Sequence, residues 1–150
     1  MSVIVATSQY MVGDRRLSID TGERLQPHTK IFKNKYLIAG GSGYFQSIVS
    51  LKQAMRSGCS DPEELIEYVD NGSEYIVLSQ HTGYLYTVND KYVIKCSKKI
   101  LGTGSGAECA LAFMAGKGST SLDCAKKALR YTFKVRMDCG DGVRTIKRGD

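Results

Sequence analysis

The spacing of apolar residues changes four times along the chain, between a period of two residues and a period of three to four. The period of two, rich in β-branched residues, predicts strands in residues 2–14, 30–41, 74–96, 99–103 and 142–148. The longer period predicts helices in residues 43–58, 60–70, 107–116 and 119–133. The helices therefore come in two consecutive pairs, and each pair separates groups of strands.

The links between the predicted strands are short, such as the turn at Asn34 and Lys35. Short links permit antiparallel pairing, whereas neighbouring parallel strands need a crossover of about a dozen residues or more. A doubly wound parallel sheet therefore does not fit. The order of elements predicts an α+β fold in which two antiparallel sheets pack face to face and a helix pair covers each outer face.

The length of the chain sets the number of domains. At 150 residues, with 42% hydrophobic residues, the chain is long enough to bury one substantial core. We expect residues 2–150 to form a single domain. No apolar run reaches the roughly 20 residues needed to cross a bilayer, so we expect a soluble protein without membrane contact.

The net charge of +6 raises the possibility of nucleic-acid binding. The densest basic runs, "KYVIKCSKK" and "RTIKRGD", alternate with apolar residues, as half-exposed strands do. No zinc-finger spacing or RNA-binding aromatic motif accompanies them, so we expect a solvated basic surface and no nucleic-acid partner. Five cysteines without a CxxC pair, and no signal peptide, indicate free thiols in the cytoplasm.

Two patterns bear on cofactors. His28 and His81 lie far from any cysteine or acidic cluster at ligand spacing, so we expect no metal. The run "GTGSGAE" lacks the Lys-Ser/Thr ending of a phosphate loop and also departs from GxGxxG. It predicts a tight turn between a strand and a helix, and we expect no cofactor.

The position of Ser2 suggests one kind of catalysis. The sequence has no GxSxG motif, and neither histidine has a recognisable nucleophile partner. A serine at the chain terminus can instead use its own α-amine as the general base, because the unperturbed pKa of that amine is about 8. Removal of Met1 would leave Ser2 in this position.

Five runs in this order carry a family resemblance: "SVIVA", "GDRRLS", "HTKIFKNKYLIAGGSGYF", "LGTGSGAECALAFMAG" and "MDCGDGVRTIK". Together they resemble the proteasome β-subunit and HslV peptidases, which are N-terminal nucleophile (Ntn) hydrolases. The resemblance covers nearly the whole chain. It implies a four-layer α/β/β/α sandwich, which agrees with the order of elements, and assembly into a ring.

The resemblance implies roles for individual residues. Ser2 matches the nucleophile, Asp14 the aspartate that orients a lysine, and Lys30 that lysine. The glycine turn matches the source of the oxyanion N–H donor, at Gly40 or Gly41. Three further residues are expected to contact an extended peptide substrate, namely Ser18, Asp20 and Thr21.

Two more positions match the family near the terminal amine. Ser105 matches its serine, and Asp138 matches the aspartate that helps to hold the amine. Asp141 stands where many members have serine, and a carboxylate there would raise the pKa of the α-amine. Taken singly, aspartates such as Asp14 and Asp138 are more often turn acids than catalytic residues.

The resemblance implies hydrolysis of peptide bonds in polypeptide substrates by a homo-oligomeric ring, served by an AAA+ unfoldase. The expected location is the cytoplasm of a bacterium or of a bacterium infected by a phage. Two alternatives stay open at this point. One is a catalytically inactive structural or regulatory subunit of the same fold, and the other is hydrolysis of a different amide.

Overall fold

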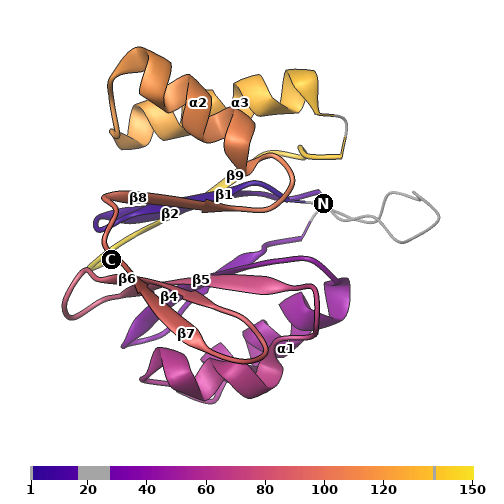
Figure 1. Cartoon of the computed structure of the whole chain (residues 1–150), viewed down its shortest axis with the longest axis vertical. Coiled ribbons are helices and arrows are strands. Elements are labelled where there is room, and N and C mark those ends of the chain that lie inside the picture. The colour runs from indigo at the N-terminus through magenta and orange to yellow at the C-terminus, as the bar shows by residue number, and fades with distance from the viewer. Residues whose placement is uncertain (1, 17–27, 137) are drawn as a thin grey trace.

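Two antiparallel sheets form the centre of the protein in the computed structural model, which describes residues 2–16, 28–136 and 138–150 (Figure 1). The first sheet has the order β8-β1-β2-β9, with β1 Ile4–Thr7, β2 Tyr10–Asp14, β8 Ile100–Thr103 and β9 Val143–Lys147. The second sheet has the order β3-β4-β5-β6-β7, with β3 Ile31–Lys33, β4 Leu37–Ser42, β5 Glu74–Ser79, β6 Leu85–Val88 and β7 Val93–Cys96. Every pairing between these strands is antiparallel, as predicted.

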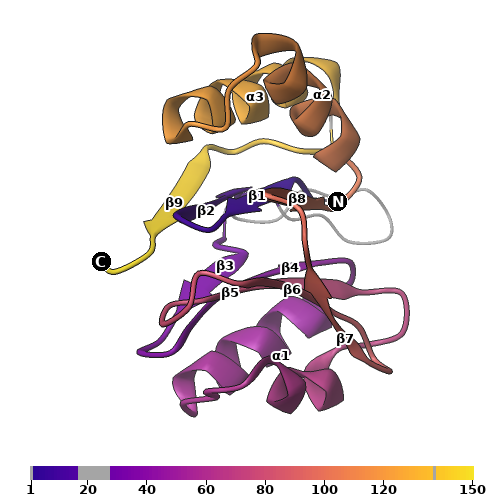
Figure 2. The same cartoon turned by 60° about the vertical axis from the view of Figure 1, so that its left-hand side comes forward.

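A pair of helices covers the outer face of each sheet (Figure 2). Helices α2 (Ala107–Lys117) and α3 (Leu122–Val135) pack on the first sheet. Helix α1 (Phe45–Arg56) and the short helix η1 (Pro62–Tyr68) pack on the second. The described residues thus form the predicted α/β/β/α sandwich.

The second predicted helix is of a tighter type than expected. Residues 62–68 form a 3₁₀-helix, in which the Glu64 N–H donates to the Asp61 carbonyl at 3.0 Å. Asp61 caps it, because its carboxylate accepts from the Glu63 N–H at 3.0 Å. Only Leu65 of this segment is fully buried, so little apolar packing favours a longer α-helix.

The strand alternation places apolar side chains in three layers. Val3, Val5 and Val12 face helices α2 and α3, whereas Ile4 and Met11 face the second sheet. Strands β1 and β2 are buried on both faces, which explains why nearly every residue in them is apolar. A third layer joins the second sheet to α1 and η1.

Tyr10 ties the first sheet to the loop between α2 and α3. Its ring is 4% exposed, and its hydroxyl donates to the Thr120 carbonyl at 2.8 Å. Burial, together with the nearby Cys124, raises the pKa of Tyr10 from 10.0 to about 12. The phenol therefore stays protonated in the folded protein at a pH where the unfolded chain loses this proton.

This shift predicts a loss of stability in alkaline solution. Between pH 10 and 12, the contribution of Tyr10 to the free energy of unfolding should fall by about 2–3 kcal/mol, because the unfolded state alone gains the ionised form. Urea unfolding of the wild type and of Tyr10→Phe across this range will measure the change as a difference between the two proteins. Tyr92→Phe, at a ring that is 51% exposed, is the matched control. An equal alkaline loss in wild type and Tyr10→Phe would contradict the assignment.

None of the helices in the described ranges has both the length and the apolar character needed to cross a membrane.

Candidate active site

A buried ion pair lies where β2 ends. The Lys30 Nζ atom is 2.9 Å from the Asp14 Oδ1 atom, and both side chains are at most 1% exposed. Asp14 is the last residue of β2, and Lys30 immediately precedes β3. The two residues that sequence analysis predicted to act together are therefore in direct contact between the two sheets.

The Asp14 carboxylate is also fixed by two backbone groups. Its Oδ1 atom accepts from the Val3 N–H at 3.1 Å, and its Oδ2 atom accepts from the Gly140 N–H at 3.2 Å. Charge-assisted bonds of this kind are stronger than neutral ones. The Asp14 carboxylate thus binds three groups: the backbone of the residue after Ser2, the ammonium of Lys30, and the loop that follows Asp138.

Burial lowers the pKa of Lys30 below its ordinary value, and the adjacent Asp14 carboxylate opposes this change. The nearby Asp138 carboxylate favours the charged ammonium as well. A lysine in such surroundings places a desolvated positive charge beside the start of the first strand.

Ser2 lies at the entry to β1 and is 2% exposed. Its carbonyl accepts from the Gly106 N–H at 3.0 Å, which ties it to the turn between β8 and α2. Gly104, at φ 97°, approaches the Ser2 backbone so closely that a Cβ atom there would overlap it. The "GTGSG" run therefore provides the close packing around the candidate nucleophile.

This packing gives a testable contrast between two glycines. Gly104→Ala should destabilise the protein by about 2–4 kcal/mol and displace Ser2, because a Cβ atom would meet the Ser2 backbone at a positive φ. Gly116→Ala, in α2 and with open space around it, should instead stabilise by up to about 1 kcal/mol. Urea unfolding of both variants checks the prediction. Equal effects would show that the contact with Ser2 is unimportant.

Ser105 and Asp138 are in contact. The Ser105 hydroxyl donates to the Asp138 Oδ2 atom at 3.1 Å, and Arg136 donates to both carboxylate oxygens at 3.3 and 3.4 Å. Burial raises the pKa of Asp138, but the bonds from Arg136 and Ser105 outweigh burial and hold this pKa below its ordinary value. Sequence analysis did not select Arg136, although its position two residues before Asp138 was a usable signal.

Cys139 directly follows Asp138 in the sequence. It is 1% exposed, and burial together with the charges of Asp14 and Asp138 raises its pKa to about 11. The thiol is therefore protonated at neutral pH and is a poor competing nucleophile.

Asp141 has an ion-pair partner that the sequence did not reveal. Its Oδ2 atom lies 3.6 Å from the Arg16 Nε atom, and the Asp141 side chain is 4% exposed. Asp141 adopts φ 62°, a region that aspartate tolerates better than most residues. The positive charge of Arg16 thus lies beside this buried carboxylate.

The glycine turn is built differently from the sequence interpretation. Gly40 and Gly41 lie inside β4, which extends to Ser42. The Gly41 N–H donates to the Lys30 carbonyl at 3.0 Å. Since alternate N–H groups of a strand point to opposite neighbours, the Gly40 N–H points toward its partner Ile76 in β5. The Gly41 N–H is thus used within the sheet, and the Gly40 N–H is directed toward β5.

Gly43 follows the end of this ladder. It is exposed and adopts φ 107°, and within the described residues its N–H donates no hydrogen bond. Its neighbour Ser42 contacts Thr103 at 2.9 Å between hydroxyl oxygens. Thr103 in turn pairs with Ile4, two residues from Ser2. The apolar alternation predicted that strand β4 ends at the glycines, but it did not predict the positive φ of Gly43.

The predicted substrate contacts at Ser18, Asp20 and Thr21 lie outside the described residues, which resume at His28.

The arrangement of the whole chain matches solved structures. Eukaryotic HslV from Trypanosoma brucei superimposes with a TM-score of 0.73 over 97% of this chain and 98% of that one, at 16% sequence identity. The chain has the fold of HslV. This Ntn-hydrolase fold confirms the architecture expected from the sequence resemblance.

Two further structures share the HslV fold. The Anbu (Gly-1) mutant from Hyphomicrobium sp. strain MC1 matches with a TM-score of 0.75 and 13% identity, over 98% of this chain and 81% of that one. Thiobacillus denitrificans BPH in complex with epoxomicin matches with a TM-score of 0.71 and 12% identity, over 99% of both chains. No family model and no curated protein matches the sequence.

Proposed function

We propose that this protein hydrolyses peptide bonds, with Ser2 as an N-terminal nucleophile after removal of Met1. One observation carries the proposal. The Asp14 Oδ1 atom accepts from both the Lys30 ammonium and the Val3 N–H, so a buried cation is anchored one residue from Ser2. The HslV fold of the chain supports the same chemistry.

The proposed reaction starts with proton transfer from the Ser2 hydroxyl to the α-amine of the same residue. The hydroxyl oxygen then attacks the peptide carbonyl, and the protonated amine donates to the leaving nitrogen. Water, activated by the same amine, releases the acyl group. The Lys30 ammonium favours this cycle because its charge lowers the pKa of the α-amine, which keeps that amine unprotonated near neutral pH.

The oxyanion of the tetrahedral intermediate needs an N–H donor that the sheet does not use. We assign this donor to Gly43 in place of Gly40 or Gly41, since Gly43 is exposed and its N–H donates no bond within the described residues. Its connection through Ser42 and Thr103 to the start of β1 supports this assignment.

Ser105 and Asp138 are proposed to hold the terminal amine. Their mutual hydrogen bond of 3.1 Å keeps both oxygens in one place, and Arg136 keeps the carboxylate ionised at neutral pH. An ionised carboxylate can accept a bond from the amine in both of its protonation states.

The N-terminus itself provides the decisive experiment. Intact-mass spectrometry should show loss of Met1, and the processed protein should react with a peptide epoxyketone. The Ser2 hydroxyl would add to the ketone carbon while the α-amine opens the epoxide, so both groups of one residue are reported together. A protein that cleaves peptides while quantitatively retaining Met1 would exclude Ser2 as the nucleophile.

The same measurements separate the alternatives. A processed protein that forms no adduct and cleaves neither peptides nor small amides would support an inactive structural or regulatory subunit. Cleavage of small amides without cleavage of peptides would support a different amide hydrolase. The burial of Ser2 makes this comparison necessary, because a substrate must reach its hydroxyl.

We further propose that the protein acts as a homo-oligomeric ring in the cytoplasm, on polypeptides supplied by an AAA+ unfoldase. The support for this is the sequence resemblance together with the HslV fold. Size-exclusion chromatography with multi-angle light scattering tests the assembly, and a monomer at working concentration would count against an enclosed chamber.

A further inference from the structure

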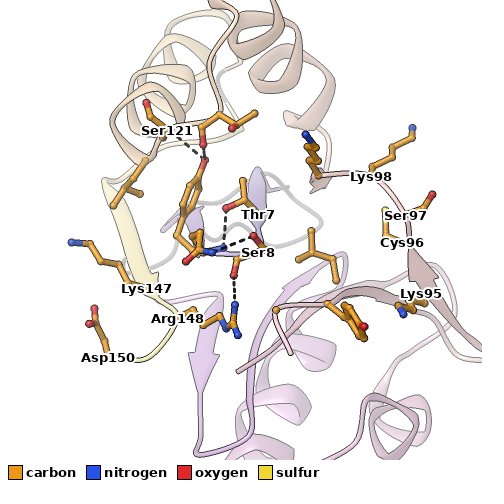
Figure 3. Close-up of a pocket in the computed structure, with 18 residues that line it drawn as sticks. Thr7, Ser8, Lys95, Cys96, Ser97, Lys98, Ser121, Lys147, Arg148 and Asp150 are labelled. Atoms are coloured by element: carbon orange, nitrogen blue, oxygen red, sulfur yellow. Dashed lines mark hydrogen bonds between the residues drawn. The ribbon is translucent and has the colours of Figure 1, made fainter. Parts of the chain in front are cut away.

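A large cavity lies beside Thr7 and Ser8, at the end of β1 that is farther along the chain from Ser2 (Figure 3). Its volume is about 1050 Å³, and none of the predicted catalytic residues lines it. Ser2 precedes β1 and Ser8 follows it, so the strand itself separates the two sites. The cavity, here called the basic cavity, is lined by residues 7–10, 83–85, 95–99, 120–122, 147, 148 and 150.

The charges of the basic cavity have one predominant sign. Among the described residues, its only acidic lining residue is Asp150, whereas its cationic lining residues are Lys95, Lys98, Lys99, Lys147 and Arg148. Lys95 belongs to β7, Lys98 and Lys99 to the connection between β7 and β8, and Lys147 and Arg148 to the end of β9 and the residue after it. Figure 3 shows Lys98 and Lys147 on opposite sides of the opening. A cavity with this excess of cations attracts negatively charged ligands.

Two of the cations are held in place. Arg148 donates to the carbonyls of Gln80 and His81 at 3.0 and 3.2 Å, so its guanidinium is fixed between the ends of the two sheets. The Lys95 Nζ atom lies 3.5 Å from the centre of the Tyr84 ring, in a cation–π contact. Charges that are already positioned cost less conformational entropy when a ligand binds.

The interior of the basic cavity is apolar, and one wall has spare backbone groups. Leu85 and Tyr10 are at most 4% exposed and face the cavity together with Leu122. On the wall formed by residues 97–99, no backbone N–H donates a hydrogen bond within the described parts of the chain. An extended peptide can pair with such groups while one of its side chains fills the apolar interior.

We propose that the basic cavity binds an acidic peptide segment of a partner protein, with one apolar side chain seated in the interior. The placement of cations on two sides of a cavity of about 1050 Å³ favours a peptide with several carboxylates over a single small anion. A peptide with several spaced carboxylates reaches Lys147 and Lys98 together. The apolar interior then binds one apolar side chain of the peptide, and the N–H groups of residues 97–99 bind its backbone. These two contacts together set the direction in which the peptide lies.

Titration calorimetry with a synthetic peptide tests the proposal on the full-length protein. The probe is a heptapeptide with glutamates around a central phenylalanine, and the matched peptide has glutamine at each glutamate. The acidic peptide should bind at least about tenfold more tightly, and its affinity should fall with added salt. Equal affinity of the two peptides, or no binding of the acidic one, would overturn the proposal.

Two triple variants with the same loss of charge locate the binding. Lys98→Gln, Lys99→Gln and Lys147→Gln together should weaken binding at least about tenfold. Lys35→Gln, Lys91→Gln and Lys134→Gln, at exposed positions outside the basic cavity, should leave it unchanged. All six lysines are exposed, so both triple variants should keep the fold. Equal weakening by the two triples would show only general charge attraction and would refute a specific site.

A chemical footprint gives an independent readout. Cys96 lines the basic cavity and is half-buried, whereas the half-buried Cys109 on α2 lies outside it. The acidic peptide should slow modification of Cys96 by a maleimide and leave Cys109 unaffected. Inorganic phosphate alone should not protect Cys96. Protection by phosphate without protection by peptide would assign the cavity to a small anion instead.

Discussion

Replacing Ser2 with alanine should reduce kcat/KM for a fluorogenic peptide by about a thousandfold or more, because the alanine side chain has no nucleophilic oxygen. Ser2→Thr should keep a substantial part of the activity, since threonine presents the same hydroxyl beside the same α-amine. Both variants should fold, because each of them also has a small side chain at the entry to β1. Initial rates on processed protein give the measurement.

The control for this prediction is another serine of the same hairpin. Ser8 is exposed at the turn after β1 and lies at the far end of the strand from Asp14 and Lys30. Ser8→Ala should therefore leave peptide hydrolysis unchanged. Hydrolysis by Ser2→Ala at the wild-type rate would remove the proposed mechanism, although the HslV fold would stand.

Lys30→Met should lower the free energy of unfolding by about 3–5 kcal/mol, because it leaves the buried Asp14 carboxylate without its cation. The two remaining backbone donors, from Val3 and Gly140, bind the carboxylate but do not neutralise it. The same variant should lose most of the peptidase activity, because the charge proposed to lower the pKa of the α-amine is gone. Urea unfolding and initial rates measure the two effects separately.

A second lysine provides a matched comparison for the stability effect. Lys127 lies 3.0 Å from Asp123 in an ion pair of nearly the same length as that of Lys30, but both side chains are more than 60% exposed. Lys127→Met should cost no more than about 0.5 kcal/mol, because water already solvates both charges. If the two substitutions lowered the free energy of unfolding equally, burial would not make the ion pair of Asp14 with Lys30 more important for stability.

A double-mutant cycle completes this test. In Asp14→Asn combined with Lys30→Met, neither charge remains buried. The double variant should therefore be more stable than the sum of the single losses predicts. Additive losses would indicate that the two side chains do not interact in the folded protein.

The order of the elements followed from local patterns. Apolar alternation predicted the strands that the described residues form, and the longer apolar period predicted the helices. In the structure Ser121 caps α3, where its hydroxyl accepts from the Cys124 N–H at 3.1 Å. The type of η1 did not follow, because the sequence signals of an α-helix and a 3₁₀-helix are the same at a Ser-Asp-Pro start. Local sequence signals predict the first residue of an element better than they predict how many of its residues will be buried.

The site followed from the sequence only in part. The contacts of Asp14 with Lys30 and of Ser105 with Asp138 agree with pairs suggested by the resemblance. The ion pair of Arg16 with Asp141 and the bonds of Arg136 were not anticipated, because they depend on how one loop folds back. We propose Gly43 as the oxyanion donor for a related reason, since the pairing of the strands decides which N–H groups are already used within the sheet.

By itself, the sequence determined the two antiparallel sheets, their helix pairs and the candidate nucleophile at Ser2, because apolar period, capping and chain position are local properties. Tertiary structure alone decided the environment of each charge. Lys30 and Lys127 are the same residue type with an aspartate at nearly the same distance, yet one pair is buried and the other is exposed. Burial depends on contacts between segments far apart in the chain, and burial sets the pKa, the strength of the ion pair and hence the chemistry that each lysine can support.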